Sequence, residues 1–138
     1  MIYTLGTNAV AVILRDDPNL VERITSAVSR GDEVALSAMT YFETKRGLFL
    51  PTFRKKLEAF TSFADRFGVL RLDITALDVA ARLYQDLRRK GTPLEDADTL
   101  IAGVAIAHDA TLVTCNFKHF ARIEDLRLES LFLKSWEA

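Results

Sequence analysis

The sequence contains one cysteine, three prolines and six glycines among 138 residues, and it has no apolar run long enough to span a bilayer. A single thiol, Cys115, cannot form an intramolecular disulfide. Together with the lack of a secretory signal pattern, this predicts a reducing, cytoplasmic environment. The composition, with 27% charged residues of mixed sign, excludes a low-complexity or disordered chain. A membrane span would need roughly 20 apolar residues, so none is predicted.

The sequence contains enough hydrophobic residues to form one core. Hydrophobic residues make up 49% of the chain, and 18 basic side chains nearly balance 19 acidic ones, for a formal net charge of -1. A chain of this length buries roughly two-thirds of the surface that its unfolded form exposes. We therefore predict a single domain over residues 1–138. The nearly neutral net charge excludes the uniformly basic surface of a protein that coats nucleic acid, but it does not exclude a local basic patch.

Short β-branched and aliphatic runs alternate with segments of helical apolar spacing. Strands are predicted at Ile2–Leu5, Val34–Leu36, Val69–Leu72 and Thr111–Val113, and within Leu126–Leu131. Helices are predicted after Asn8, over Asn19–Ser29, around Glu43, from Pro51 to Phe67, over Ile74–Lys90 and over Leu94–His108. This alternation predicts an α/β fold with a mostly parallel central sheet of about five strands, covered by helices on both faces.

Several polar residues lie at or near the carboxyl ends of the predicted strands, where parallel sheets bind their ligands. They are Thr7, Asn8, Glu43, Asp96, Asp98, Thr114 and Asn116. Carboxylate and amide oxygens from separate segments are the ligands that Mg²⁺ and Mn²⁺ prefer. Such ions support hydrolysis of a phosphodiester bond, so the pattern is compatible with a metal-dependent site of that kind.

Each of these residues also has a purely structural interpretation. Glu43 lies three residues after Thr40, which is the spacing of a capping box, and on spacing alone that role is favoured over metal binding. Asp96 and Asp98 have the positions of acids that stabilise the first turn of a helix. Asp98 lies at the margin of the buried stripe, where a carboxylate needs a partner. The strand-end threonines and asparagines are common turn and cap residues.

Other catalytic constellations are missing from the sequence. It has no G-x-G-x-x-G, P-loop, H-E-x-x-H or G-x-S-x-G motif. His108 and His119 lack zinc-ligand spacing, so surface or hydrogen-bonded roles are favoured for both. Cys115 has the setting of a small buried hydrophobe. The apolar series from Phe53 to Phe67 has helical spacing and is typical of core or of a subunit interface.

Four segments, taken in order, resemble PIN-domain ribonucleases, and among these the VapC toxins of bacterial toxin–antitoxin pairs. The segments are M-I-Y-T-L-G-T-N at the start, Ser37 to Gly47 with Tyr41-Phe42-Glu43, P-L-E-D-A-D-T-L-I-A from Pro93, and A-T-L-V-T-C-N from Ala110 with Phe120. The resemblance extends from Met1 to about Leu131. It implies a three-layer α/β/α fold and endonucleolytic cleavage of RNA that depends on Mg²⁺ or Mn²⁺.

The resemblance also implies roles for individual residues. Glu43, Asp98 and Asp96 correspond to the catalytic and metal-binding acids, and the supporting residues are Thr7, Asn8, Thr114 and Asn116. The family pattern at the end of the first strand is L-D-T-N, with a metal-binding Asp, whereas this chain has Gly6 at that position. Loss of one anionic ligand removes charge and fixed geometry, so weak or absent cleavage is expected.

Two explanations for Gly6 remain open. The chain is either a natural relic that binds partners without cleaving RNA, or it carries a change that was fixed because the active toxin harms its host. Retention of Glu43, Asp96 and Asp98 favours the second explanation. A receiver-like phosphoacceptor is rejected, because the strand ends lack the Asp and Lys that it requires.

The resemblance further implies three partners: a VapB-like antitoxin, an RNA substrate and a second copy of the chain in a homodimer. The antitoxin's C-terminal tail would lie across the acidic pocket and a helix groove. The candidates for protein contact are Phe49, Phe53 and Phe60. The basic residues that could follow an RNA backbone, or simply face solvent, are Arg46, Arg54, Lys55, Lys56 and Arg88-Arg89-Lys90.

Overall fold

Five parallel strands form the centre of the computed structural model, which describes residues 1–15 and 17–131. They are β1 (Ile2–Leu5), β2 (Glu33–Ser37), β3 (Val69–Leu70), β4 (Ala110–Thr114) and β5 (Leu128–Ser130). The sheet order is β3-β2-β1-β4-β5, and every pairing is parallel. The predicted α/β class and five-stranded sheet are confirmed. The third strand is two residues long rather than four.

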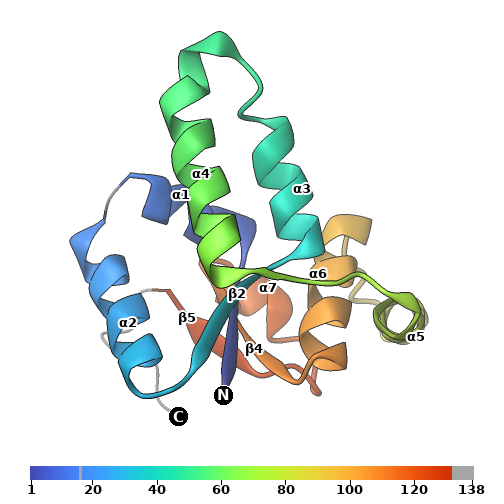
Figure 1. The fold of residues 1–138 in the computed structure, drawn as a ribbon. Helices are drawn as coiled ribbons and strands as arrows, with labels where there is room; N and C mark the ends of the chain where they lie inside the picture. Colours follow the sequence, from blue (N-terminus) through green and yellow to red (C-terminus); the bar gives the residue numbers. More distant parts are fainter. Residues whose placement is uncertain (16, 132–138) are drawn as a thin grey trace.

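Seven α-helices and one 3-10 turn connect the strands within the described residues. The helices are α1 (Thr7–Leu14), α2 (Pro18–Ser29), α3 (Ala38–Arg46), α4 (Arg54–Phe67), α5 (Ile74–Arg89), α6 (Asp96–Ala107) and α7 (Phe117–Phe120). The 3-10 turn η1 (Pro51–Phe53) precedes α4. Figure 1 shows α3 and α4 side by side, extending above the sheet. The short helix α7 is not predicted from the sequence, because four residues are too few to show an apolar period.

Apolar side chains cover both faces of the sheet and make it the middle of three layers. On one face, Tyr3 and Leu5 of β1 pack with buried residues of α1, α2 and α4. On the other face, Leu112 of β4 packs with Ile101 and Ala105 of α6 and with Leu87 of α5. Successive residues of a strand point to opposite faces, so the apolar strands serve both layers. The three-layer α/β/α arrangement implied by the family resemblance is confirmed.

The aromatic series of α4 belongs mainly to the core. Phe60 is fully buried and lies 5.5 Å from Tyr41, measured between ring centroids. Phe63 and Phe67 are partly buried against the same cluster. The prediction that Phe60 offers a contact to a partner is therefore wrong, because its ring fills the space between α4 and the sheet. Phe49, between α3 and η1, is 67% exposed and remains available.

Helices α5 and α6 approach each other closely at Gly103. A Cβ on this residue would lie 2.8 Å from the Cβ of Ala80 and 2.9 Å from the carbonyl oxygen of Ala76. Glycine is therefore required here by the contact between the two helices. This packing holds α6, which begins with Asp96 and Asp98, against the rest of its layer.

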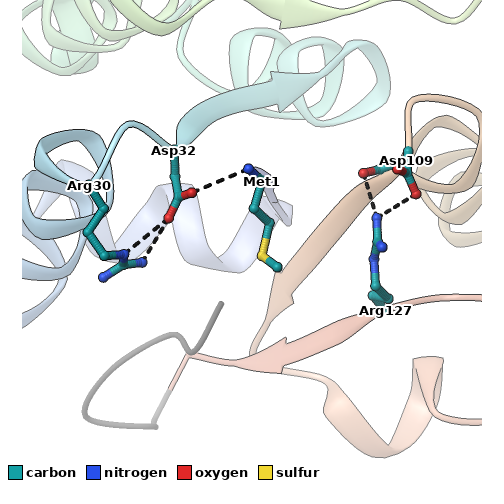
Figure 2. Close-up of polar contacts among 5 residues, drawn as sticks. All are labelled: Met1, Arg30, Asp32, Asp109 and Arg127. Carbon is teal, nitrogen blue, oxygen red and sulfur yellow. Dashed lines mark hydrogen bonds and ion pairs between the residues drawn. The ribbon is translucent and has the colours of Figure 1, made fainter.

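Ion pairs hold the amino ends of the strands, at the edge of the sheet shown in Figure 2. The N-terminal ammonium lies 3.3 Å from Asp32, and Arg30 lies 3.0 Å from the other oxygen of the same carboxylate. Arg127 similarly pairs with Asp109. Partial burial of Asp32 opposes its ionisation, but hydrogen bonds and charge from Arg30 and the ammonium outweigh this effect and lower its pKa. Asp32 therefore favours folding while it is ionised.

In the part of the chain that the structure describes, no helix has the length and apolar character to cross a bilayer.

Candidate functional site

The site lies at the carboxyl edge, the edge of the sheet where the parallel strands end. In the β1 pairings, Leu5 lies opposite Leu36 of β2 and Val113 of β4, so these three strands end at the same level. The amide of Gly6 donates a hydrogen bond to the carbonyl of Val113, 2.9 Å away. Helix α3 contacts both α1 and α6. The segments that carry Thr7, Glu43 and Asp98 therefore meet at this edge.

The start of α3 is fixed by a buried cap. Ser37 ends β2, and its Oγ accepts a hydrogen bond from the amide of Thr40 at 3.1 Å and donates one to Thr40 Oγ1 at 2.9 Å. Both side chains are fully buried. The capping-box interpretation of Glu43 is therefore wrong, because Ser37 is the cap and Glu43 lies in the second turn of the helix. Its carboxylate is thus available to contact another element.

Glu43 points toward the start of α1. Thr7 Oγ1 donates a hydrogen bond to Glu43 Oε1 across 2.9 Å, and these two residues are 36 positions apart in the sequence. The other carboxylate oxygen lies 3.9 Å from the guanidinium of Arg46, and the side chain of Glu43 is 20% exposed. The structure thus brings together two of the predicted site residues, one an acid and the other a supporting hydroxyl.

Asp98 is paired with a histidine that is not among the predicted site residues. Asp98 Oδ2 lies 2.9 Å from Nε2 of His119, which belongs to α7. The predicted hydrogen-bonded role of His119 is confirmed, but its partner was not foreseen. Asp98 also lies in the first turn of α6, where the helix dipole stabilises negative charge. No sequence signal indicates this pairing, because its members are 21 positions apart and the whole of β4 lies between them.

In the described part of the chain, the remaining predicted residues form no hydrogen bond or ion pair with the Thr7–Glu43 pair or with the Asp98–His119 pair. Asp96 is exposed and lines a cleft with Leu77 and Tyr84 of α5. It does not share the direction of Asp98, because residues two apart on a helix point about 200° apart. Asn8 is exposed. Thr114 is buried, and its Oγ1 accepts a hydrogen bond from the amide of Asn116 at 2.9 Å.

Gly6 occupies an ordinary backbone conformation. Its φ of -70° and ψ of 165° are accessible to any L-residue, and it is the N-cap of α1 without a side-chain cap bond. A Cβ on Gly6 would lie 3.4 Å from the carbonyl oxygen of Val113 and 3.8 Å from Thr114 Oγ1. These are ordinary van der Waals distances. The fold therefore does not require glycine at this position, and a larger side chain would project at the same edge as Glu43 and Asp98.

Cys115 follows β4 and packs against the core. Burial raises the pKa of its thiol, and the charge of Arg15 acts in the opposite direction without cancelling the increase. The thiol therefore stays protonated at neutral pH, as a small hydrophobe does and a nucleophile does not. The predicted packing of Cys115 against the core is confirmed, but its predicted burial is not, because the residue is only partly buried.

Comparison with known proteins identifies the fold. The PIN domain model matches residues 3–126. The chain belongs to the PIN domain family. This PIN domain protein is 33% identical to ribonuclease VapC2 of Rickettsia felis over 135 residues, which cover 94% of the chain and 98% of that relative. It is 30% identical to the tRNA(fMet)-specific endonuclease VapC of Salmonella typhimurium over 131 residues, 92% of the chain and 96% of that relative.

The crystal structure of VapBC2 from Rickettsia felis, bound to a DNA fragment from its promoter, has the same fold. It matches with a TM-score of 0.87 at 27% identity and covers 99% of this chain and 100% of that one. The resemblance inferred from the four sequence segments is thus confirmed at the level of the PIN domain family and of its VapC members.

The side chains at the carboxyl edge of this PIN domain do not fit a divalent metal ion as they stand. Within residues 1–15 and 17–131, no three His, Cys, Asp or Glu side chains gather into a metal-binding group. The two carboxylates at the edge are engaged, Glu43 by Thr7 and Asp98 by His119. A hard cation prefers about six oxygen ligands, several of them anionic or carbonyl. Gly6, at the same edge, contributes no side-chain donor.

Proposed function

We propose that this VapC-type PIN domain protein is the toxin of a toxin–antitoxin pair, that its fold is built for endonucleolytic cleavage of RNA, and that Gly6 leaves the cleavage weak or absent. The observation that carries the proposal is the carboxyl edge itself. Glu43 and Asp98 remain there with their hydrogen-bonding partners, and position 6, which has room for a side chain, lacks the third carboxylate.

The residues that remain hold two negative charges in fixed positions. Thr7 orients the carboxylate of Glu43, and His119 orients that of Asp98. In a site without a third ligand, these carboxylates repel the approaching phosphodiester instead of stabilising its cleavage. An Asp at position 6 would complete a set of three carboxylates, and we propose Mg²⁺ or Mn²⁺ as the ion that such a site would hold. Asp96, on the opposite side of α6, is a less favourable candidate for this set.

A VapB-like antitoxin is the proposed partner, because the Rickettsia felis and Salmonella typhimurium structures similar to this chain are VapBC complexes. An apolar cavity of about 340 Å³ lies between α1, α2 and α4, and it is lined by Ile13, Val21, Ile24 and Phe63 among others. Such a groove suits the apolar face of an amphipathic segment. Phe49, exposed at the tip of the α3–α4 pair, is a candidate contact for a second copy in a homodimer. We place the protein in the cytoplasm.

The test restores the missing carboxylate. The Gly6→Asp variant is expected to cleave RNA with Mg²⁺ or Mn²⁺ and to stop in EDTA, whereas the parent chain cleaves weakly or not at all. A folded Gly6→Asp variant that remains inert with both ions would contradict the proposal.

A second candidate function is that of a non-catalytic PIN protein retained for binding its antitoxin. It is favoured by the absence of a three-ligand cluster among the described residues. It predicts tight association with the antitoxin and no gain of cleavage on restoring the Asp.

A further inference from the structure

We propose that a cavity beside the Asp98–His119 pair binds the RNA backbone through Lys118 and Arg122, with Phe117 as a stacking surface for a neighbouring base. This inference rests on the proposed function, because it concerns how the same site takes its RNA. The cavity is here called the β4–β5 cavity, because it lies beyond the carboxyl ends of those two strands. Its volume is about 540 Å³, and its lining includes Asn116, Phe117, Lys118, His119, Arg122 and Ser130.

The charge of the β4–β5 cavity differs from that of the chain as a whole. The chain has a formal net charge of -1, yet the cavity is lined by Lys118 and Arg122 and by no acidic residue. Neither cation is paired with an acid within residues 1–15 and 17–131. Two uncompensated positive charges in a concave surface attract an anion such as phosphate.

The basic residues predicted from the sequence are mostly compensated instead. Arg46 lies 3.9 Å from Glu43, Arg54 lies 3.5 Å from Glu58, and Lys90 lies 3.9 Å from Glu124. Arg89 pairs with Asp86. These pairs reduce the attraction of the helix faces for RNA. Lys118 and Arg122 of the β4–β5 cavity have no such partner acid among the described residues.

Arg122 is held in place by the loop that leads into α6. One guanidinium nitrogen, Nη1, donates hydrogen bonds to the carbonyl of Pro93 at 3.0 Å and of Thr92 at 3.5 Å. A guanidinium has five N–H donors in a planar fork, so donors remain for a ligand in the cavity. The contact also fixes the cation beside the start of the helix that carries Asp98.

His119 connects the cavity to the acidic site. Its ring lines the cavity and lies 2.9 Å from the carboxylate of Asp98. A phosphate in the cavity would therefore lie next to the Asp98–His119 pair. The cations there would offset the repulsion between the Asp98 carboxylate and the RNA backbone.

Phe117 favours single-stranded RNA over a free anion as the occupant. Its side chain lines the same cavity and is 43% exposed, next to Lys118 in the sequence. A cation beside an exposed aromatic ring is the combination with which proteins bind single strands, since the cation holds the phosphate and the ring stacks on a base. A free phosphate gains nothing from the ring.

The experiment measures the anisotropy of a fluorescently labelled single-stranded RNA of mixed sequence, in EDTA, with the parent chain. The Lys118→Glu variant is expected to bind at least about 10-fold more weakly at low salt and to reduce the slope of log affinity against log salt by about 0.7 or more. The matched control is Arg82→Glu, an equal change of charge at an exposed position of α5. Phe117→Leu is expected to weaken binding about 5-fold or more, and Phe49→Leu is its control.

The outcomes separate this inference from the proposed function. Equal effects of Lys118→Glu and Arg82→Glu would overturn the proposed role of the cavity while leaving RNA as the substrate. A Phe117→Leu variant that binds like the parent would show an anion site without base stacking, which also overturns the inference. Absence of RNA binding by both the folded parent and the Gly6→Asp variant would instead refute the proposed function. Loss of antitoxin binding alone in Lys118→Glu would reassign the cavity to the protein partner.

Discussion

Restoring a carboxylate at position 6 tests the chemistry of the site without disturbing the fold. The backbone of Gly6 is extended, and a Cβ would have its nearest contact, 3.4 Å, with the carbonyl oxygen of Val113. Gly6 is also an N-cap, where Asp is preferred over Gly by a few tenths of a kcal/mol. Replacing Gly at a compatible position stabilises by about 0.4–1 kcal/mol through the unfolded chain. Repulsion from Glu43 and Asp98 opposes these gains in EDTA.

The expected changes in stability and in cleavage rate follow from the three-carboxylate site that Gly6→Asp would complete. In EDTA we expect the free energy of unfolding of Gly6→Asp to lie within about 1 kcal/mol of the parent. With Mn²⁺ at one hundred times its dissociation constant, the variant gains about 2.7 kcal/mol of stability. The parent gains much less, because no three-ligand group exists among its described residues. Cleavage of RNA increases at least about 100-fold, which corresponds to about 2.7 kcal/mol of transition-state stabilisation.

The assay combines urea unfolding, followed by circular dichroism, with cleavage of a labelled RNA in Mg²⁺, Mn²⁺ or EDTA. Gly6→Ala adds the Cβ without the carboxylate, and Gly6→Asn adds a neutral side chain of the same shape. Neither control is expected to gain cleavage or metal-dependent stability. The reasoning is refuted if Gly6→Ala cleaves as fast as Gly6→Asp. It is also refuted if the parent already cleaves at the rate of the restored variant.

Three further predictions concern the stability of the fold. Gly103→Ala should cost about 1–3 kcal/mol in urea unfolding, because its Cβ overlaps α5, whereas Gly47→Ala, with 3.6 Å to its nearest neighbour, should have little effect. Asp32→Asn should lower stability at pH 7, and the difference should disappear as the pH falls below about 4, because the lowered pKa of Asp32 stabilises only the ionised state. Ser37→Ala should cost about 1–2 kcal/mol, since Thr40 loses its buried partner; an unchanged urea midpoint would contradict the assigned cap.

The order of elements was predictable because it depends on local patterns. Apolar periodicity and the glycines at helix ends located all five strands and six of the seven described helices. The strand ends indicated where polar side chains converge, and the structure pairs Thr7 with Glu43 and Asp98 with His119 near that edge, whereas the roles of these residues stay predictions. The capping box failed because the spacing of Thr40 and Glu43 does not reveal which residue begins the helix. Ser37, buried at the end of β2, is the cap.

The sequence by itself determined the α/β class, the family resemblance and the absence of an acid at position 6. Each of these depends on residues that are close together in the sequence, as the residues of an apolar period or of a short motif are. Only the tertiary structure decided that His119 is the partner of Asp98, that Asp96 lies in another cleft, and that Lys118 and Arg122 share a cavity beside the site. The physical reason is that these contacts join segments far apart in the chain. Their geometry exists only once the parallel strands have brought their carboxyl ends to one edge.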